Sequence, residues 1–148
     1  MNKPAIFLRI ASTLAFLHAV LHTIGGVFGK AGPGPAAVAV LAMKVNQFPL
    51  MGNERSYWDF YRGLALAVTI FLMAEAVVFW QLASLAKIDS RQLRPILAVF
   101  LVAYIALAVN SYVYFFLGPV IVEIMIAACL GLAVISVKSR REAYASAV

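Results

Sequence analysis

The sequence predicts an all-α, polytopic membrane protein, a four-transmembrane-helix bundle that forms a single membrane domain over residues 1–148. Hydrophobic residues make up 64% of the chain and charged residues 12%, whereas soluble domains are about half apolar and about a quarter charged. Four apolar runs are each long enough to cross a bilayer, which requires about 20 residues. Basic residues gather at the ends of these runs on one side, as the positive-inside rule describes.

The four predicted spans lie at about residues 7–28, 58–85, 95–117 and 119–137. The first follows a basic N-terminus, as in a signal peptide, but it continues to Phe28 and carries two histidines, so we expect an uncleaved helix. The second would rise about 42 Å against a hydrocarbon core of about 30 Å, so we expect it to tilt or to project. Gly118-Pro119 predicts a tight turn before the fourth span.

The first loop opens with the Gly/Pro-rich stretch from Lys30 to Pro35, which cannot continue a helix because proline lacks an amide donor. The apolar residues 36–45 then predict a short interfacial helix. Tyr57, Trp58 and Tyr61 stand where the second span should enter the outer leaflet, which is typical of an aromatic belt.

Charge placement predicts the topology. Eight basic residues flank the N-terminus, the second connection and the C-terminus, at positions 3, 9, 87, 91, 94, 138, 140 and 141. The positive-inside rule then places both termini in the cytoplasm, with the first loop extracytoplasmic, and we expect a multi-pass protein of the inner (cytoplasmic) membrane. The net charge of +6 forms no basic stripe with interleaved aromatics, so nucleic acid is not an expected partner.

Five polar residues fall inside the predicted spans: His18, His22, Glu75, Asn110 and Glu123. Such groups are unfavourable in lipid and normally face a bundle interior or a water-filled cavity. Counting from the cytoplasmic helix ends at about 1.5 Å per residue places His18 and Glu75 at about 15–16 Å, and the other three at about 21–22 Å. We therefore expect two polar layers one helical turn apart.

These layers suggest an intramembrane binding or acid–base site for a lipophilic small molecule, with isomerase- or hydrolase-like chemistry. The site should open into an apolar cavity of about 300–1,000 Å³. The candidate catalytic residues are His22, Glu123 and Glu75. The candidate binding residues are His18, Asn110, Asp59, Arg62 and Trp58, with Asp59 and Arg62 spaced to pair on one helix face.

Three alternatives stay open. The polar residues could only fix helix packing in a non-catalytic subunit or a homo-oligomer that meets through Gly25 and Gly29 or through Ala127 and Gly131, because small residues four apart permit close helix approach. The two histidines and two carboxylates could complete a metal sphere, although a lone His-x3-His is weak evidence and we expect no cofactor. A proton-coupled carrier would usually need more helices or an inverted repeat. Cys129, the single cysteine, allows no internal disulfide.

Three segments, residues 17–26, 55–63 and 110–119, resemble a family of small bacterial four-helix membrane proteins of uncharacterised activity. A weaker likeness is to the EXPERA group of sterol isomerases and sigma-2 receptors, through a histidine in the first helix and a glutamate in the second. That likeness implies an intramembrane pocket for sterols or lipophilic amines. The MAPEG enzymes share size and helix number, but Glu54-Arg55 is followed by Ser-Tyr-Trp-Asp, which breaks their motif.

Overall fold

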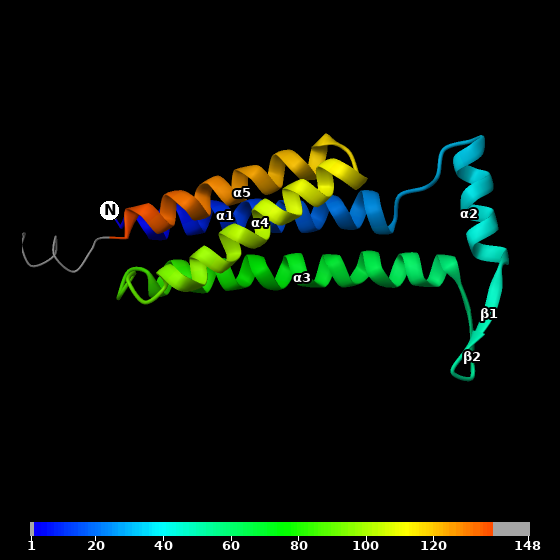
Figure 1. Cartoon of the computed structure of the whole chain (residues 1–148), viewed down its shortest axis with the longest axis horizontal. Coiled ribbons are helices and arrows are strands. Elements are labelled where there is room, and N and C mark those ends of the chain that lie inside the picture. Colours follow the sequence, from blue (N-terminus) through cyan, green and yellow to red (C-terminus); the bar gives the residue numbers. More distant parts are fainter. Residues whose placement is uncertain (1, 138–148) are drawn as a thin grey trace, which may run out of the picture. The chain divides into compact units, whose positions relative to one another are not determined.

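The computed structural model describes residues 2–137 and is almost entirely helical (Figure 1). Its elements in chain order are α1 (Lys3–His22), the π-helical turn η1 (Thr23–Val27), α2 (Pro35–Val45), β1 (Gln47–Leu50), β2 (Asn53–Ser56), α3 (Tyr57–Leu85), α4 (Arg94–Tyr114) and α5 (Leu117–Ser136). Four segments are long and apolar enough to cross a membrane: α1 with η1, α3, α4 and α5. The four predicted helices of spanning length are therefore confirmed, and the shorter helix α2 follows the first of them along the chain.

Prolines set the helix starts. Helix α1 begins at Lys3 with Pro4 at its second position, earlier than predicted, and α4 has Pro95 in its first turn. A proline is tolerated there because its missing N–H would have no partner in the helix. The same rule explains why the turn predicted at Gly118-Pro119 is wrong. The chain reverses at Phe115 and Phe116, and Gly118-Pro119 already lies in the first turn of α5.

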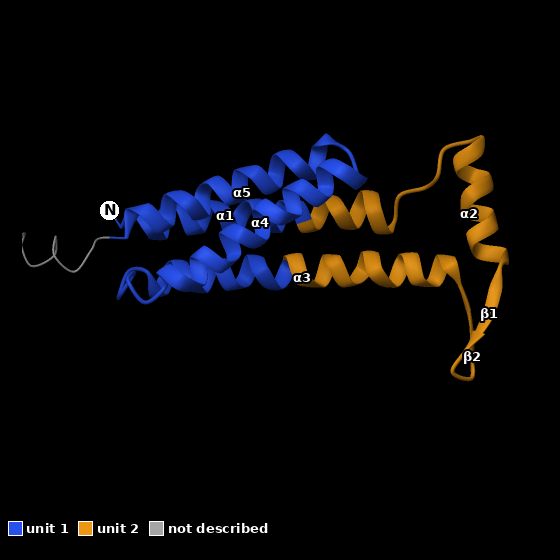
Figure 2. Ribbon diagram, viewed as in Figure 1, with its two compact units in different colours: residues 1–18, 73–148 blue, residues 19–72 orange. Residues whose placement is uncertain are grey.

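The chain divides into two compact units, coloured separately in Figure 2. Unit 1 combines residues 1–18 with residues 73–148, and unit 2 is residues 19–72. The division cuts through α1 and α3, so each of these helices contributes to both units. The two units are described separately below.

Unit 1 holds the main core, where α4 and α5 pack side by side (Figure 1). Its largest fully buried side chains are Tyr104, Phe79, Leu8, Leu97, Ile126 and Leu130. Helix α1 contributes alanines to this core, including Ala11 and Ala15. Small residues such as these let helix backbones approach closely. Its Ser12 hydroxyl donates to the Ala76 carbonyl of α3 at 2.7 Å, which ties the two helices at their closest faces.

Large apolar side chains also cover the outer surface of the helices. Ile70 and Phe71 of α3 and Val99 and Val102 of α4 are all more than 60% exposed. A soluble protein rarely exposes so continuous an apolar surface, whereas helices in lipid require it. The exposed apolar surface and the hydropathy together favour helices that cross a membrane.

Unit 2 contains a β-hairpin that the all-α prediction missed. Strands β1 and β2 pair antiparallel around Met51 and Gly52, whose φ angles are 50° and 82°. Two successive residues with positive φ make the tight turn whose twist matches a two-stranded ribbon. Ser56 at the end of β2 then caps α3, because its hydroxyl oxygen accepts from the Asp59 backbone N–H at 3.2 Å. In return, the Ser56 backbone N–H and hydroxyl both donate to the Asp59 carboxylate at 2.8 Å.

Candidate functional site

The first buried polar contact of unit 1 joins α3 to α4. The Tyr104 hydroxyl donates to Glu75 Oε2 at 2.7 Å. Tyr104 is fully buried and Glu75 half-buried, and the tyrosine ring packs against Phe79 with centroids 6.0 Å apart. Because Phe79 lies one helical turn after Glu75, the same face of α3 holds both the ring and the hydroxyl.

A second contact joins α4 to α5. The Ser111 hydroxyl donates to Glu123 Oε1 at 3.0 Å, and both residues are buried, with Glu123 only 5% exposed. The other carboxylate oxygen of Glu123, Oε2, is also buried and has no hydrogen-bond partner within residues 2–137. Buried polar atoms nearly always have a partner, so this oxygen is the least satisfied acceptor in the unit 1 interior.

The two contacts belong to one face of α4, because Tyr104 and Ser111 are seven residues apart, or two helical turns. Both glutamates also act electrostatically on Tyr104. We call Glu75, Tyr104, Ser111 and Glu123 the carboxyl–hydroxyl cluster. It places two acidic groups and two hydroxyls inside unit 1, each acid held by a hydroxyl from the shared helix α4.

The cluster includes two of the predicted site residues, Glu75 and Glu123, and excludes a third. Asn110 is exposed, and its neighbour Ser111 makes the contact with Glu123. One residue turns a helix by about 100°, so adjacent positions face different surroundings. The spacing of Leu97, Tyr104 and Ser111, all buried at intervals of seven, is a signal that could have identified this face.

The two predicted histidines fall in different units. His18 is half-buried in unit 1. In unit 2, His22 Nε2 lies 3.1 Å from the Ala65 carbonyl oxygen of α3, and its ring packs against Gly26 of η1. The predicted pairing of His22 with Glu123, and the two polar layers, stay predictions.

The π-helical turn η1 was not predicted. The Phe28 N–H donates to the Thr23 carbonyl at 3.1 Å, the wider spacing of a π-helix. The Thr23 hydroxyl donates to the Ala19 carbonyl at 2.6 Å and lies 3.1 Å from the Thr69 hydroxyl. Turns of this kind are frequent at functional sites, and this one directly follows His22.

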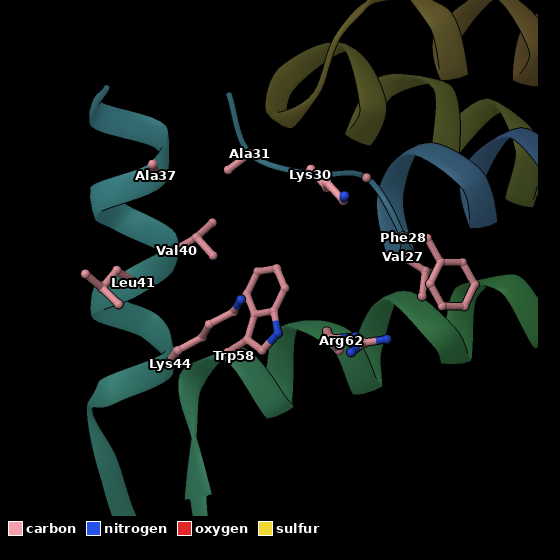
Figure 3. Close-up of a pocket in the computed structure, with 11 residues that line it drawn as sticks. Val27, Phe28, Lys30, Ala31, Ala37, Val40, Leu41, Lys44, Trp58 and Arg62 are labelled. Carbon is pink, nitrogen blue, oxygen red and sulfur yellow. The ribbon is translucent and has the colours of Figure 1, made fainter. Parts of the chain in front are cut away.

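A pocket of about 480 Å³ lies in unit 2 between η1, α2 and the start of α3 (Figure 3). Its lining residues are Val27, Phe28, Gly29, Lys30, Ala31, Ala37, Val40, Leu41, Lys44, Trp58 and Arg62. It has the size of the predicted cavity but is lined by neither histidine nor carboxylate. Of the predicted binding residues, Trp58 and Arg62 line it, whereas Asp59 is engaged by Ser56.

The two predicted pairs of small residues, Gly25 with Gly29 and Ala127 with Gly131, have different surroundings. A Cβ added to Gly25 would meet nothing within 4 Å, whereas one added to Gly29 would strike the Gly25 carbonyl of the same chain. Ala127 is buried in the unit 1 core, and a Cβ on Gly131 would lie 4.0 Å from Leu101 of α4. The second pair therefore lies on the side of α5 that packs against α4.

Within residues 2–137, no group of three or more His, Cys, Asp or Glu side chains is placed to hold a metal ion. Asp59 accepts from Ser56 and also interacts electrostatically with Arg62, and the predicted pairing of Asp59 with Arg62 stays a prediction. Comparison of the chain with models of protein families, with curated proteins and with solved structures finds no match.

Proposed function

We propose that this protein spans the inner (cytoplasmic) membrane with both termini in the cytoplasm, and that the carboxyl–hydroxyl cluster is an intramembrane binding or acid–base site for a lipophilic small molecule. Four helices of spanning length support the membrane location. The basic residues at one set of helix ends support the orientation. The substrate would enter from the lipid, since the helices expose apolar surface along their length.

The observation that carries the proposal is the unpartnered, buried Oε2 of Glu123. Ser111 holds Oε1, so the carboxyl group is oriented and only Oε2 is free to bind. A ligand hydroxyl or amine would donate to it, and a ligand carbonyl would accept its proton when the acid is protonated. The single satisfied oxygen therefore orients the acid toward a ligand.

Acid–base chemistry needs a second group that exchanges protons with the first. Glu75 is a candidate within unit 1, and Tyr104 links it to the α4 face that also carries Ser111. An isomerase-like step would move a proton from one carbon or oxygen of the substrate to Glu123 and return one elsewhere. In a hydrolase-like step a water molecule would attack the substrate and give a proton to Glu75, while Glu123 would protonate the leaving group. His22 remains a candidate donor or acceptor.

The test compares ligands retained by the purified protein in detergent, identified by native mass spectrometry and lipid extraction. The variant Glu123→Gln keeps an oxygen to accept from Ser111 but loses the acid. We expect it to retain at least tenfold less of a lipophilic molecule than the wild type. The control Glu54→Gln removes an exposed carboxylate from β2 and should change nothing. Equal retention by Glu123→Gln and wild type would reject the site.

The second candidate is a non-catalytic subunit or homo-oligomer in which the cluster only fixes helix packing. Each hydroxyl–carboxyl pair bridges two helices, and Gly25 is exposed with open space around it, as an oligomer contact would require. Gly25→Leu should then shift the oligomeric state measured by light scattering, while Glu123→Gln should leave bound lipids unchanged. Ala127 and Gly131, the other predicted contact, pack against α4 of the same chain, so Gly25 is the position to test.

A further inference from the structure

The pocket of unit 2 concentrates positive charge. Of the four basic residues between positions 30 and 62, three line it: Lys30, Lys44 and Arg62. No acidic side chain is part of the lining. We call this pocket, lined by the residues named above, the cationic pocket. Like charges gathered in one lining repel one another, so the arrangement favours an anion among them.

The chain offsets the three cations only in part, because Arg62 interacts electrostatically with the Asp59 carboxylate outside the pocket lining. Within residues 2–137, none of them forms an ion pair with a carboxylate. Lys44 Nζ lies 4.9 Å from the Trp58 ring, and the Arg62 guanidinium lies 5.9 Å from the Phe28 ring. These ring contacts leave the N–H donors of both cations available. The Arg62 Nε is buried and has no hydrogen-bond partner in the described chain.

The rest of the lining is apolar. Figure 3 shows Val40 pointing into the pocket from α2, Trp58 standing on α3 beside Lys44, and Phe28 on the far side of Arg62. A volume of about 480 Å³ exceeds what one small ion needs and falls in the range of pockets for whole small molecules, about 300–1,000 Å³. The pocket therefore suits a molecule with an anionic group and an apolar part.

Membrane topology adds an independent argument. On the proposed orientation this pocket lies on the extracytoplasmic side, where short loops carry few basic residues. The positive-inside rule therefore does not explain why Lys30, Lys44 and Arg62 line one cavity on that side. Phosphate esters are anions that lysine and arginine both bind, since arginine presents a planar set of donors and lysine a mobile one.

We propose that the cationic pocket binds the phosphate ester group of an amphiphilic molecule. Lys30, Lys44 and Arg62 would donate to the phosphate oxygens, and Trp58 and Val40 would contact the part of the molecule next to it. Phosphate of this kind can come from the headgroup of an anionic lipid or from a soluble phosphate ester. The pocket shares no residue with the carboxyl–hydroxyl cluster, so either proposal can fail alone.

The test is native mass spectrometry of the full chain in detergent, titrated with phosphatidylglycerol and with phosphatidylcholine. We expect wild type to retain phosphatidylglycerol more strongly, because the choline cation opposes the pocket charges. The double variant Lys44→Gln, Arg62→Gln should bind it about a hundredfold more weakly, about tenfold for each of the two lost charge-assisted contacts. The control Arg55→Gln removes a basic residue of the same loop that does not line the pocket and should bind like wild type.

A second pair of variants tests the pocket even if the double variant fails to fold. Val40→Glu places a carboxylate in the pocket, whereas Val38→Glu places one on an exposed position of the same helix, 68% accessible. Only Val40→Glu should abolish binding. Competition with soluble glycerol phosphate then separates the sources: displacement of the lipid supports a soluble ester, and no displacement supports a membrane lipid. Equal phosphatidylglycerol binding by wild type, Val40→Glu and the double variant would overturn the proposal.

Discussion

The contact between Tyr104 and Glu75 offers the sharpest test of how unit 1 is held together. Tyr104→Phe removes one oxygen atom and nothing else. The ring stays, with its packing against Phe79 at 6.0 Å, so no cavity larger than the hydroxyl forms. What is lost is a hydrogen bond of 2.7 Å between a fully buried hydroxyl and a half-buried carboxyl group.

The expected magnitude follows from two reference values. A hydrogen bond to a charged group in a soluble protein contributes about 1.5–3 kcal/mol. Double-mutant cycles in a membrane protein average about 0.6 kcal/mol and reach about 1.7, because the unfolded chain in lipid also finds partners. The short distance and the full burial of Tyr104 place this bond toward the upper membrane value. We expect Tyr104→Phe to lower the free energy of unfolding by about 1–1.5 kcal/mol.

The assay is reversible unfolding in mixed micelles with increasing dodecyl sulfate, followed by circular dichroism of the helices. Tyr112→Phe is the matched control, since Tyr112 lies on the same helix but is 73% exposed, and it should change stability by less than about 0.5 kcal/mol. A cycle with Glu75→Gln isolates the pair. A coupling energy near zero, or equal effects of the two tyrosine variants, would refute the proposed role of the contact.

Three other predictions concern the α5 core, the α3 cap and the contact between His22 and Gly26. In the same unfolding assay, Leu130→Ala should lower the free energy of unfolding by at least about 2 kcal/mol, because Leu130 is fully buried. Leu132→Ala, the control, should lower it far less, since Leu132 is 41% exposed. Equal losses would contradict the assignment of Leu130 to the buried face of α5. Ser56→Ala should weaken the α3 cap by about 1 kcal/mol, seen as faster amide exchange in the first turn of α3 and contradicted by unchanged exchange. Gly26→Ala should shift the His22 imidazole resonances, because the new Cβ would lie 3.1 Å from the ring, whereas Gly25→Ala, the control, should not.

The sequence alone determined where the spanning helices lie. Apolar runs of the required length, bounded by prolines, glycines and basic residues, predict four spans within a few residues of their observed bounds. This works because a chain in lipid must satisfy its backbone hydrogen bonds locally, so each span is a property of its own segment. The same reasoning identified Glu75 and Glu123 as residues that need polar surroundings.

The partners of those residues were decided by the tertiary structure. Asn110 was the predicted companion of Glu123, yet Ser111 makes the contact, because the rotation of α4 about its axis depends on how it packs and not on its own composition. The hairpin also escaped prediction, and of the residues that line the cationic pocket only Trp58 and Arg62 were predicted to bind. The hairpin and the pocket depend on where Met51 and Gly52 turn the chain and on how α2 lies against the start of α3, and only contacts between separate segments determine such arrangements.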